Sequence, residues 1–124
     1  MARGIQNFSV LLKEISRPII AAACFFIIRV TNKEILPEYL YWYLNQMPVK
    51  NYITQYSGRG VHMPVVRRSV LENIDVLIHT MEIQKKIMEI NALMLEEQEL
   101  LNCLAIKRRE IITSICLQAI REIK

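Results

Sequence analysis

The sequence predicts an α+β protein, in which a small α/β globule over residues 1–79 precedes one long coiled-coil helix over residues 80–124. Two observations lead to this prediction. Up to Ile78, runs of β-branched residues alternate with segments of helical spacing, whereas from Thr80 onward the chain contains neither glycine nor proline. Strands favour β-branched side chains and helix interiors exclude Gly and Pro, so the two parts belong to different structural classes.

The first part begins with Phe8–Glu14, which the sequence indicates to be a short helix or an edge segment. Pro18 resists the continuation of a helix, so a turn is expected there. The run from Ile19 to Val30 is β-branched, aromatic and small, which favours one strand or a bent pair of strands. Its uncharged stretch Ile19–Ile28 is about half of the roughly 20 residues that a membrane-spanning helix needs, so no membrane segment is expected.

Residues Pro37 to Tyr56 carry apolar and aromatic side chains at helical spacing, and Pro48 predicts a break into two helices. Tyr39, Trp42 and Tyr43 form an aromatic stripe along this segment. Such rings stack on bases in some nucleic-acid-binding proteins, but large rings at helical spacing more often supply buried area. We therefore expect these three rings to be at least partly core.

A glycine loop follows over Ser57–Gly60, where two glycines permit positive φ on either side of Arg59. Ser69 is expected to cap a short helix, with Glu72 three residues later as its capping-box partner. The segment Asn73–Ile78 predicts a final short strand.

A helix that starts at Thr80 as its cap and runs to the last residue would span roughly 65 Å at 1.5 Å per residue. Its apolar positions advance in alternating steps of four and three, the spacing of a coiled-coil seam. The predicted dimerisation residues in this seam are Ile87, Ile90, Met94, Glu97, Leu101, Leu104, Arg108, Ile111 and Ile115. Its two charged members are complementary when two copies run antiparallel, which predicts a homodimer through antiparallel long helices. The same spacing would also suit a long helix in an ordinary bundle.

Composition and charge restrict the function classes. The chain has 124 residues, of which 52% are hydrophobic and 23% charged, and a formal net charge of +4. Such a composition is typical of a folded protein rather than a disordered one. Residues 1–79 contain nine Lys and Arg against five Asp and Glu, whereas residues 80–124 contain seven of each. The positive excess therefore lies in the first part, as expected if that part meets a polyanion.

No motif of the sequence points to catalysis. His62 and His79 are the only histidines, and the sequence contains no P-loop, H-E-x-x-H motif or nucleophile elbow. Cys24, Cys103 and Cys116 lack the spacing of metal ligands, so we expect them to be buried thiols in a cytoplasmic protein. The sequence predicts a protein without enzymatic activity, cofactor or metal.

Several segments resemble, in order and spacing, the specificity subunits of type I restriction-modification systems. These segments are Phe26–Val30, Leu36–Asn45, Gly58–Gly60 with Met63 and Pro64, Leu71–Val76, and Gln84 with Ile87 at the start of the long helix. The family's proline-rich entry to that helix has no counterpart in Leu77–Gln84. The resemblance implies the end of a target-recognition domain over residues 1–79, followed by the family's long helix over residues 80–124.

The resemblance also implies that the chain recognises DNA sequence without catalysis, with double-stranded DNA and methyltransferase subunits as its partners. Around the glycine loop, the candidate contacts to phosphates and base edges are Lys50, Gln55, Arg59, His62, Arg67 and Arg68. Two alternatives stay open. Arg67 and Arg68 could be solvated surface without a partner. The chain could also be a truncated specificity fragment that acts only as a coiled-coil assembly or regulatory partner and contacts no DNA.

Overall fold

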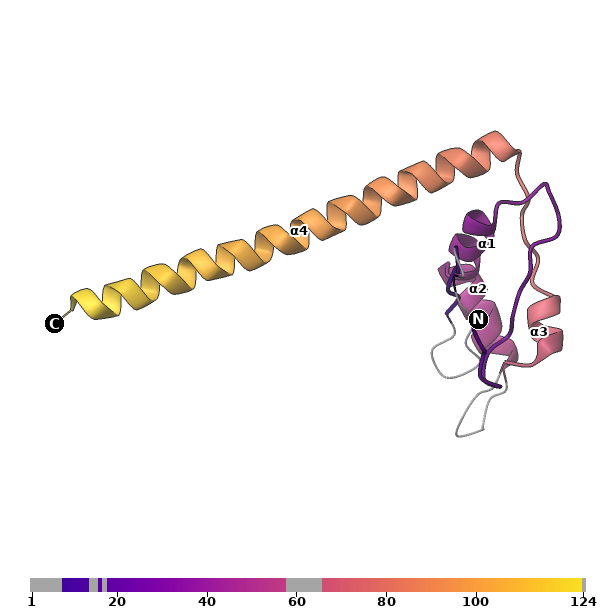
Figure 1. Ribbon diagram of the computed structural model, residues 1–124, viewed down its shortest axis with the longest axis horizontal. Coiled ribbons are helices and arrows are strands. Elements are labelled where there is room, and N and C mark those ends of the chain that lie inside the picture. Colours follow the sequence, from indigo (N-terminus) through magenta and orange to yellow (C-terminus); the bar gives the residue numbers. More distant parts are fainter. Residues whose placement is uncertain (1–7, 14–15, 17, 58–65, 124) are drawn as a thin grey trace. The chain divides into compact units, whose positions relative to one another are not determined.

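The computed structural model describes residues 8–13, 16, 18–57 and 66–123. The chain divides into two compact units, Met1–Lys86 and Ile87–Lys124, which are called the N-terminal unit and the C-terminal unit below. The helices of the described residues, labelled in Figure 1, are α1 (Pro37–Leu44), α2 (Met47–Tyr56), α3 (Arg68–Glu72) and α4 (Met81–Glu122).

The predicted α+β class is wrong, because the described residues contain helices and no β-strand. Where the sequence predicts a strand between Ile19 and Val30, the chain makes a turn in which the Phe25 N–H donates to the Ala22 carbonyl (3.0 Å). Phe25 is an isolated bridge position rather than part of a ladder. The predicted helix or edge segment at Phe8 is also irregular over the described residues 8–13. β-branched composition favours a strand only where a neighbouring strand supplies hydrogen-bond partners.

The predicted strand Asn73–Ile78 is irregular as well, and α1 supplies the reason. The Tyr39 hydroxyl donates to the carbonyl of Leu77 (2.8 Å), and the Tyr43 hydroxyl donates to the carbonyl of Asp75 (3.1 Å). In a sheet, such carbonyls would accept N–H groups from a neighbouring strand. Here two phenol groups take that place, so the segment is held along a helix without forming a ladder.

The predicted division of residues 37–56 into two helices is confirmed, and the break lies just before Pro48. α1 ends with two short-range bonds, from the Asn45 N–H to Trp42 (3.1 Å) and from the Gln46 N–H to Tyr43 (3.0 Å). Pro48 then lies in the first turn of α2. A proline there lacks only an N–H that has no intrahelical partner anyway, so it starts α2 rather than interrupting it.

α3 starts two residues earlier than the predicted capping box requires. Arg67 is its N-cap residue, and no side-chain hydrogen bond caps the helix. Glu72 does not reach back toward Ser69, because it pairs with Arg68 four residues before it (2.7 Å). The capping-box prediction is therefore wrong, and the ion pair along α3 explains where the carboxylate goes.

The described core of the N-terminal unit is small and lies mainly between α1 and α2. Its buried cluster consists of Leu44, Val49, Ile53 and Val66, with Tyr39 buried beside it at 2% exposure. Partly buried side chains packed against this cluster are Phe26, Leu40, Tyr43, Tyr52, Val70 and Ile74. The prediction of a partly core aromatic stripe is confirmed for Tyr39, Trp42 and Tyr43, since Trp42 and Tyr43 are half-buried.

The long C-terminal helix is confirmed. Figure 1 shows α4 as one uninterrupted helix, and its first hydrogen bond runs from the Gln84 N–H to the Thr80 carbonyl (3.0 Å). Cys103 and Cys116 on this helix are exposed, as is Cys24 in the N-terminal unit. The expectation of buried thiols is therefore wrong, because two of the three cysteines lie on a helix with almost no burial of its own.

Candidate functional site

The candidate DNA contacts lie at two helices of the N-terminal unit. Lys50 and Gln55 belong to α2, whereas Arg67 is the N-cap residue of α3 and Arg68 its first residue. α2 and α3 pack against each other. Arg59 and His62 lie outside the described residues.

The two candidates on α2 do not share one face. Val49 and Ile53 define the buried side of this helix. At 100° per residue, Lys50 and Gln55 project about 140° apart around the helix axis. Lys50 is half-buried beside the core face, whereas Gln55 is exposed. A straight DNA duplex therefore cannot contact both side chains on α2 at once. It would have to bend around the helix to do so.

The two arginines of α3 differ in what already engages them. Arg67 is exposed, and so is Arg68, whose Nε atom donates to the Glu72 carboxylate at 2.7 Å. The side chains of this pair are 80% and 57% exposed, and an ion pair in such a setting contributes at most about 1 kcal/mol. A phosphate group could therefore displace Glu72 from Arg68 at little cost.

The side chains of the aromatic stripe on α1 pack against one another and are at least partly buried. The Tyr39 ring lies 5.8 Å from that of Trp42 and 6.1 Å from that of Tyr43. Burial raises the pKa of the Tyr39 phenol, and the nearby Tyr43 raises it further. With its ring buried and its hydroxyl bound to Leu77, Tyr39 has no face left for a base.

Asn45 at the end of α1 ties an early segment of the chain to that helix. Its Oδ1 atom accepts the Ser9 N–H (3.0 Å), and its Nδ2 atom donates to the carbonyls of Ser9 (3.1 Å) and Tyr41 (3.0 Å). The Ser9 hydroxyl also donates to Tyr41 (3.3 Å). The tyrosines and the asparagine of the Leu36–Asn45 motif thus act by holding irregular segments.

Gln84 makes the corresponding attachment at the start of α4. This side chain is completely buried (0% exposed), although it is polar. Its Nε2 atom donates to the carbonyls of Glu34 and His79 (both 2.7 Å), and its Oε1 atom accepts the Leu36 N–H (2.9 Å). A primary amide has both the donors and the acceptor that these backbone groups require. In the sequence, Gln84 stands out only as part of a helix-start motif. Its burial is not evident there, because two of its three partners, Glu34 and Leu36, are distant in the chain.

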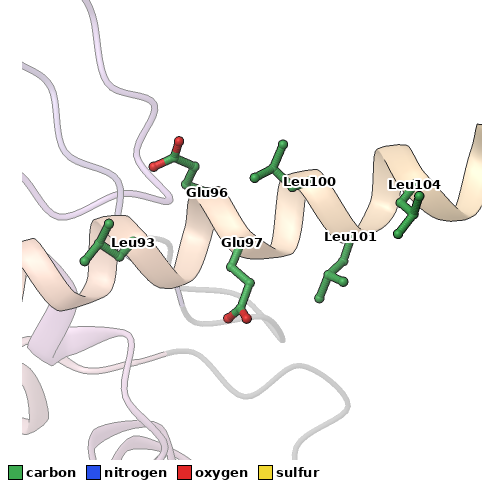
Figure 2. Close-up of a pocket in the computed structure, with 6 residues that line it drawn as sticks. All are labelled: Leu93, Glu96, Glu97, Leu100, Leu101 and Leu104. Atoms are coloured by element: carbon green, nitrogen blue, oxygen red, sulfur yellow. The ribbon is translucent and has the colours of Figure 1, made fainter.

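The predicted dimerisation residues lie along α4 in one seam. Ile87 is half-buried, and the other eight residues of the seam are exposed. Around the middle of the helix, a shallow apolar groove of about 340 Å³ is lined by Leu93, Glu96, Glu97, Leu100, Leu101 and Leu104. Figure 2 shows Glu97 and Leu101 projecting from the same side of α4. An exposed leucine-rich surface of this length is typical of a helix that associates with another helix.

A second apolar groove, of about 490 Å³, lies in the N-terminal unit. Its lining residues are Phe26, Ile27, Ile28, Leu40, Leu44, Arg68, Leu71, Glu72, Ile74 and Val76. The Arg68–Glu72 ion pair therefore borders an apolar groove next to the candidate DNA contacts.

Within the described residues, no group of three or more His, Cys, Asp or Glu is placed to hold a metal ion. None of the helices formed by these residues is both long enough and apolar enough to cross a membrane. Comparisons with protein-family models, with curated proteins and with solved structures find no match.

Proposed function

We propose that this chain is a non-catalytic DNA-recognition subunit of half size, of the kind found in type I restriction-modification systems. Its N-terminal unit would contact double-stranded DNA, and α4 would join it to methyltransferase subunits. The observation that carries this proposal is the exposed seam of α4 on a chain whose positive charge excess lies entirely before that helix. The resemblance in the order of the sequence segments supports the same function.

The chemistry of such a subunit requires donors rather than catalytic groups. Arginine side chains bind phosphate through several N–H groups in a planar fork. Arg67 and Arg68 are exposed at adjacent positions, and the ion pair that engages Arg68 is a weak surface one. Contacts of this kind position a protein on the duplex, and contacts to base edges then select the sequence.

The dependence of DNA binding on salt tests the DNA-binding part of the proposal. Replacing Arg67 and Arg68 together with alanine should weaken binding at low salt. It should also reduce the slope of log affinity against log salt by about one for each phosphate that the variant no longer neutralises. The matched control removes the same charge from the C-terminal unit through Lys107→Ala and Arg109→Ala, and should leave the slope unchanged. Equal slopes for wild type and both variants would remove α3 from the DNA face.

A purely assembling role is the second candidate, and the small core of the N-terminal unit favours it. In that case α4 would pair with a full specificity subunit or a methyltransferase, and the N-terminal unit would contact no DNA. Wild-type protein would then show negligible DNA affinity even at low salt, where phosphate contacts are strongest. Co-purification from the native cell should recover a methyltransferase subunit or a full specificity subunit in either case, so the DNA affinity is the measurement that separates the candidates.

A further inference from the structure

Two charged residues interrupt the apolar seam of α4, and each is isolated from opposite charge on its own helix. On a helix, a charged side chain reaches oppositely charged neighbours three or four positions away. At these distances from Glu97 and Arg108, the sequence has only apolar residues: Leu93, Met94, Leu100, Leu101, Leu104, Ala105, Ile111 and Ile112. Both charges are exposed in the single chain. Any helix that covers the seam must therefore bring their partners with it, or leave them buried alone at a high cost.

The apolar members of the seam require such a cover. Ile90 is 67% exposed, Leu101 52% and Leu104 46%, although all three residues lie at core positions of the heptad pattern. A partner that fits must offer apolar residues at the same spacing and a charge opposite to each of Glu97 and Arg108.

We propose that the partner is a second copy of this chain, with the two α4 helices antiparallel in the register that sets Glu97 opposite Arg108. With Leu101 at heptad position a, Leu104 is at position d, and antiparallel seams pair a with d. The same register sets Leu101 opposite Leu104, Met94 opposite Ile111, and Ile90 opposite Ile115. Each pairing occurs twice by symmetry, so both Glu97 residues and both Arg108 residues obtain partners.

Other arrangements of two copies leave the charges unmatched. A parallel pair stacks Glu97 on Glu97 and Arg108 on Arg108, and both contacts are repulsive. A shift of the antiparallel pair by one heptad sets Glu97 against Leu101 in one direction and against Ile115 in the other. Each shift buries four charges against apolar side chains. The two charged positions thus select both the orientation and the register.

This pairing goes beyond the proposed function, because it needs neither DNA nor a methyltransferase. The full-length chain alone is sufficient to test it, and a failure to bind DNA would leave it standing.

Sedimentation equilibrium of charge-reversal variants tests the pairing. Glu97→Arg places two arginines opposite each other at two sites of the dimer and should raise the dissociation constant at least about tenfold. Adding Arg108→Glu restores opposite charges and should recover the wild-type constant to within about threefold. The control Glu99→Arg makes the same change outside the seam and should leave association unchanged. Circular dichroism confirms that each variant is helical. A wild-type chain that stays monomeric at high concentration, a double variant as weak as the single one, or an equal effect of Glu99→Arg would overturn the proposal.

A spin label on the exposed Cys116 tests orientation and register directly. In the proposed register, the two labels of a Cys24→Ser/Cys103→Ser protein lie about 27 residues apart along the helices, or about 40 Å. The shifted registers predict axial separations of about 30 and about 50 Å, and a parallel pair places the labels side by side, about 10 Å apart. A pulsed dipolar measurement with a main distance near 40 Å supports the proposal. Any of the other three distances as the main one overturns it.

Discussion

The N-terminal unit and the C-terminal unit treat their apolar and polar side chains in opposite ways. In the N-terminal unit, a few apolar side chains are fully buried, and buried or half-buried polar side chains bind backbone groups of distant segments. In the C-terminal unit, apolar side chains are abundant along α4 and exposed. The first unit has its own tertiary contacts, whereas the second is a regular helix whose apolar side chains are left uncovered by the described part of the chain. Most helices in proteins depend on the packing of an apolar face.

The largest expected effect separates a buried isoleucine of the first unit from an exposed one of the second. Ile53→Ala in α2 should lower the free energy of unfolding by about 2–5 kcal/mol, because it leaves a cavity in the core. Trp42, the single tryptophan, belongs to the N-terminal unit, so urea unfolding followed by its fluorescence reports on that unit. Ile106→Ala on α4, where the side chain is 58% exposed, is the matched control. It should change the same transition by less than about 0.5 kcal/mol.

Similar losses from both variants would show that the N-terminal unit depends on α4 beyond the described contacts. A further variant, Leu101→Ala, sharpens the comparison. It should weaken self-association and leave the Trp42 transition of the monomer unchanged.

The next effect concerns the polar attachment at Gln84. Gln84→Leu keeps a side chain of similar size but leaves the Leu36 N–H without its acceptor and two carbonyls without their donor. A buried group left unsatisfied costs about 1–3 kcal/mol, and the Trp42 transition should shift accordingly. Gln98→Leu is the control, since Gln98 is exposed and its described hydrogen bond is to Asn102 on the same helix (3.2 Å). A Gln84→Leu protein that unfolds like wild type would mean that burial of this side chain contributes nothing through its hydrogen bonds.

The same contrast between units decides what the sequence could predict. α4 and the pair α1 and α2 are local structures, and the signals for them, helical spacing and a proline that starts α2, lie within the segments themselves. The strand predictions fail because a strand needs a partner elsewhere in the chain. The carbonyls of Asp75 and Leu77 accept hydrogen bonds from tyrosine hydroxyls instead. No pattern within the segment Asn73–Ile78 predicts these bonds.

The two sets of candidate site residues also differ in how well the sequence could predict their placement. The seam of α4 follows from spacing alone, and the structure places its residues on one continuous helix. The candidate DNA contacts depend on how α2 and α3 are packed. Sequence reasoning grouped Lys50 with Gln55, and the helix geometry sends these two side chains in different directions. It also did not foresee that Glu72 would bind Arg68, because the capping-box motif and an ion pair four residues apart compete for the same carboxylate.

The smallest effect is the pH dependence that Tyr39 gives to the first unit. Because burial and the neighbouring Tyr43 raise the pKa of Tyr39 above its ordinary value of 10.0, the folded state holds the phenol proton more tightly than the unfolded state does. The stability that depends on this proton is fully present below about pH 10, and it is lost as the pH rises from the ordinary pKa through the raised one. Tyr39→Phe removes the hydrogen bond to Leu77, which should lower the free energy of unfolding by about 0.5–1.5 kcal/mol at neutral pH. The variant also lacks the phenol proton, so it should lose less stability than wild type as the pH rises. Urea unfolding at pH 8 and pH 11, followed by Trp42 fluorescence, measures both effects. Tyr41→Phe, a change at an exposed ring of the same helix, should retain the wild-type loss between the two pH values. An equally steep loss in Tyr39→Phe and wild type would show that the alkaline sensitivity of the first unit arises from a group other than its buried tyrosine.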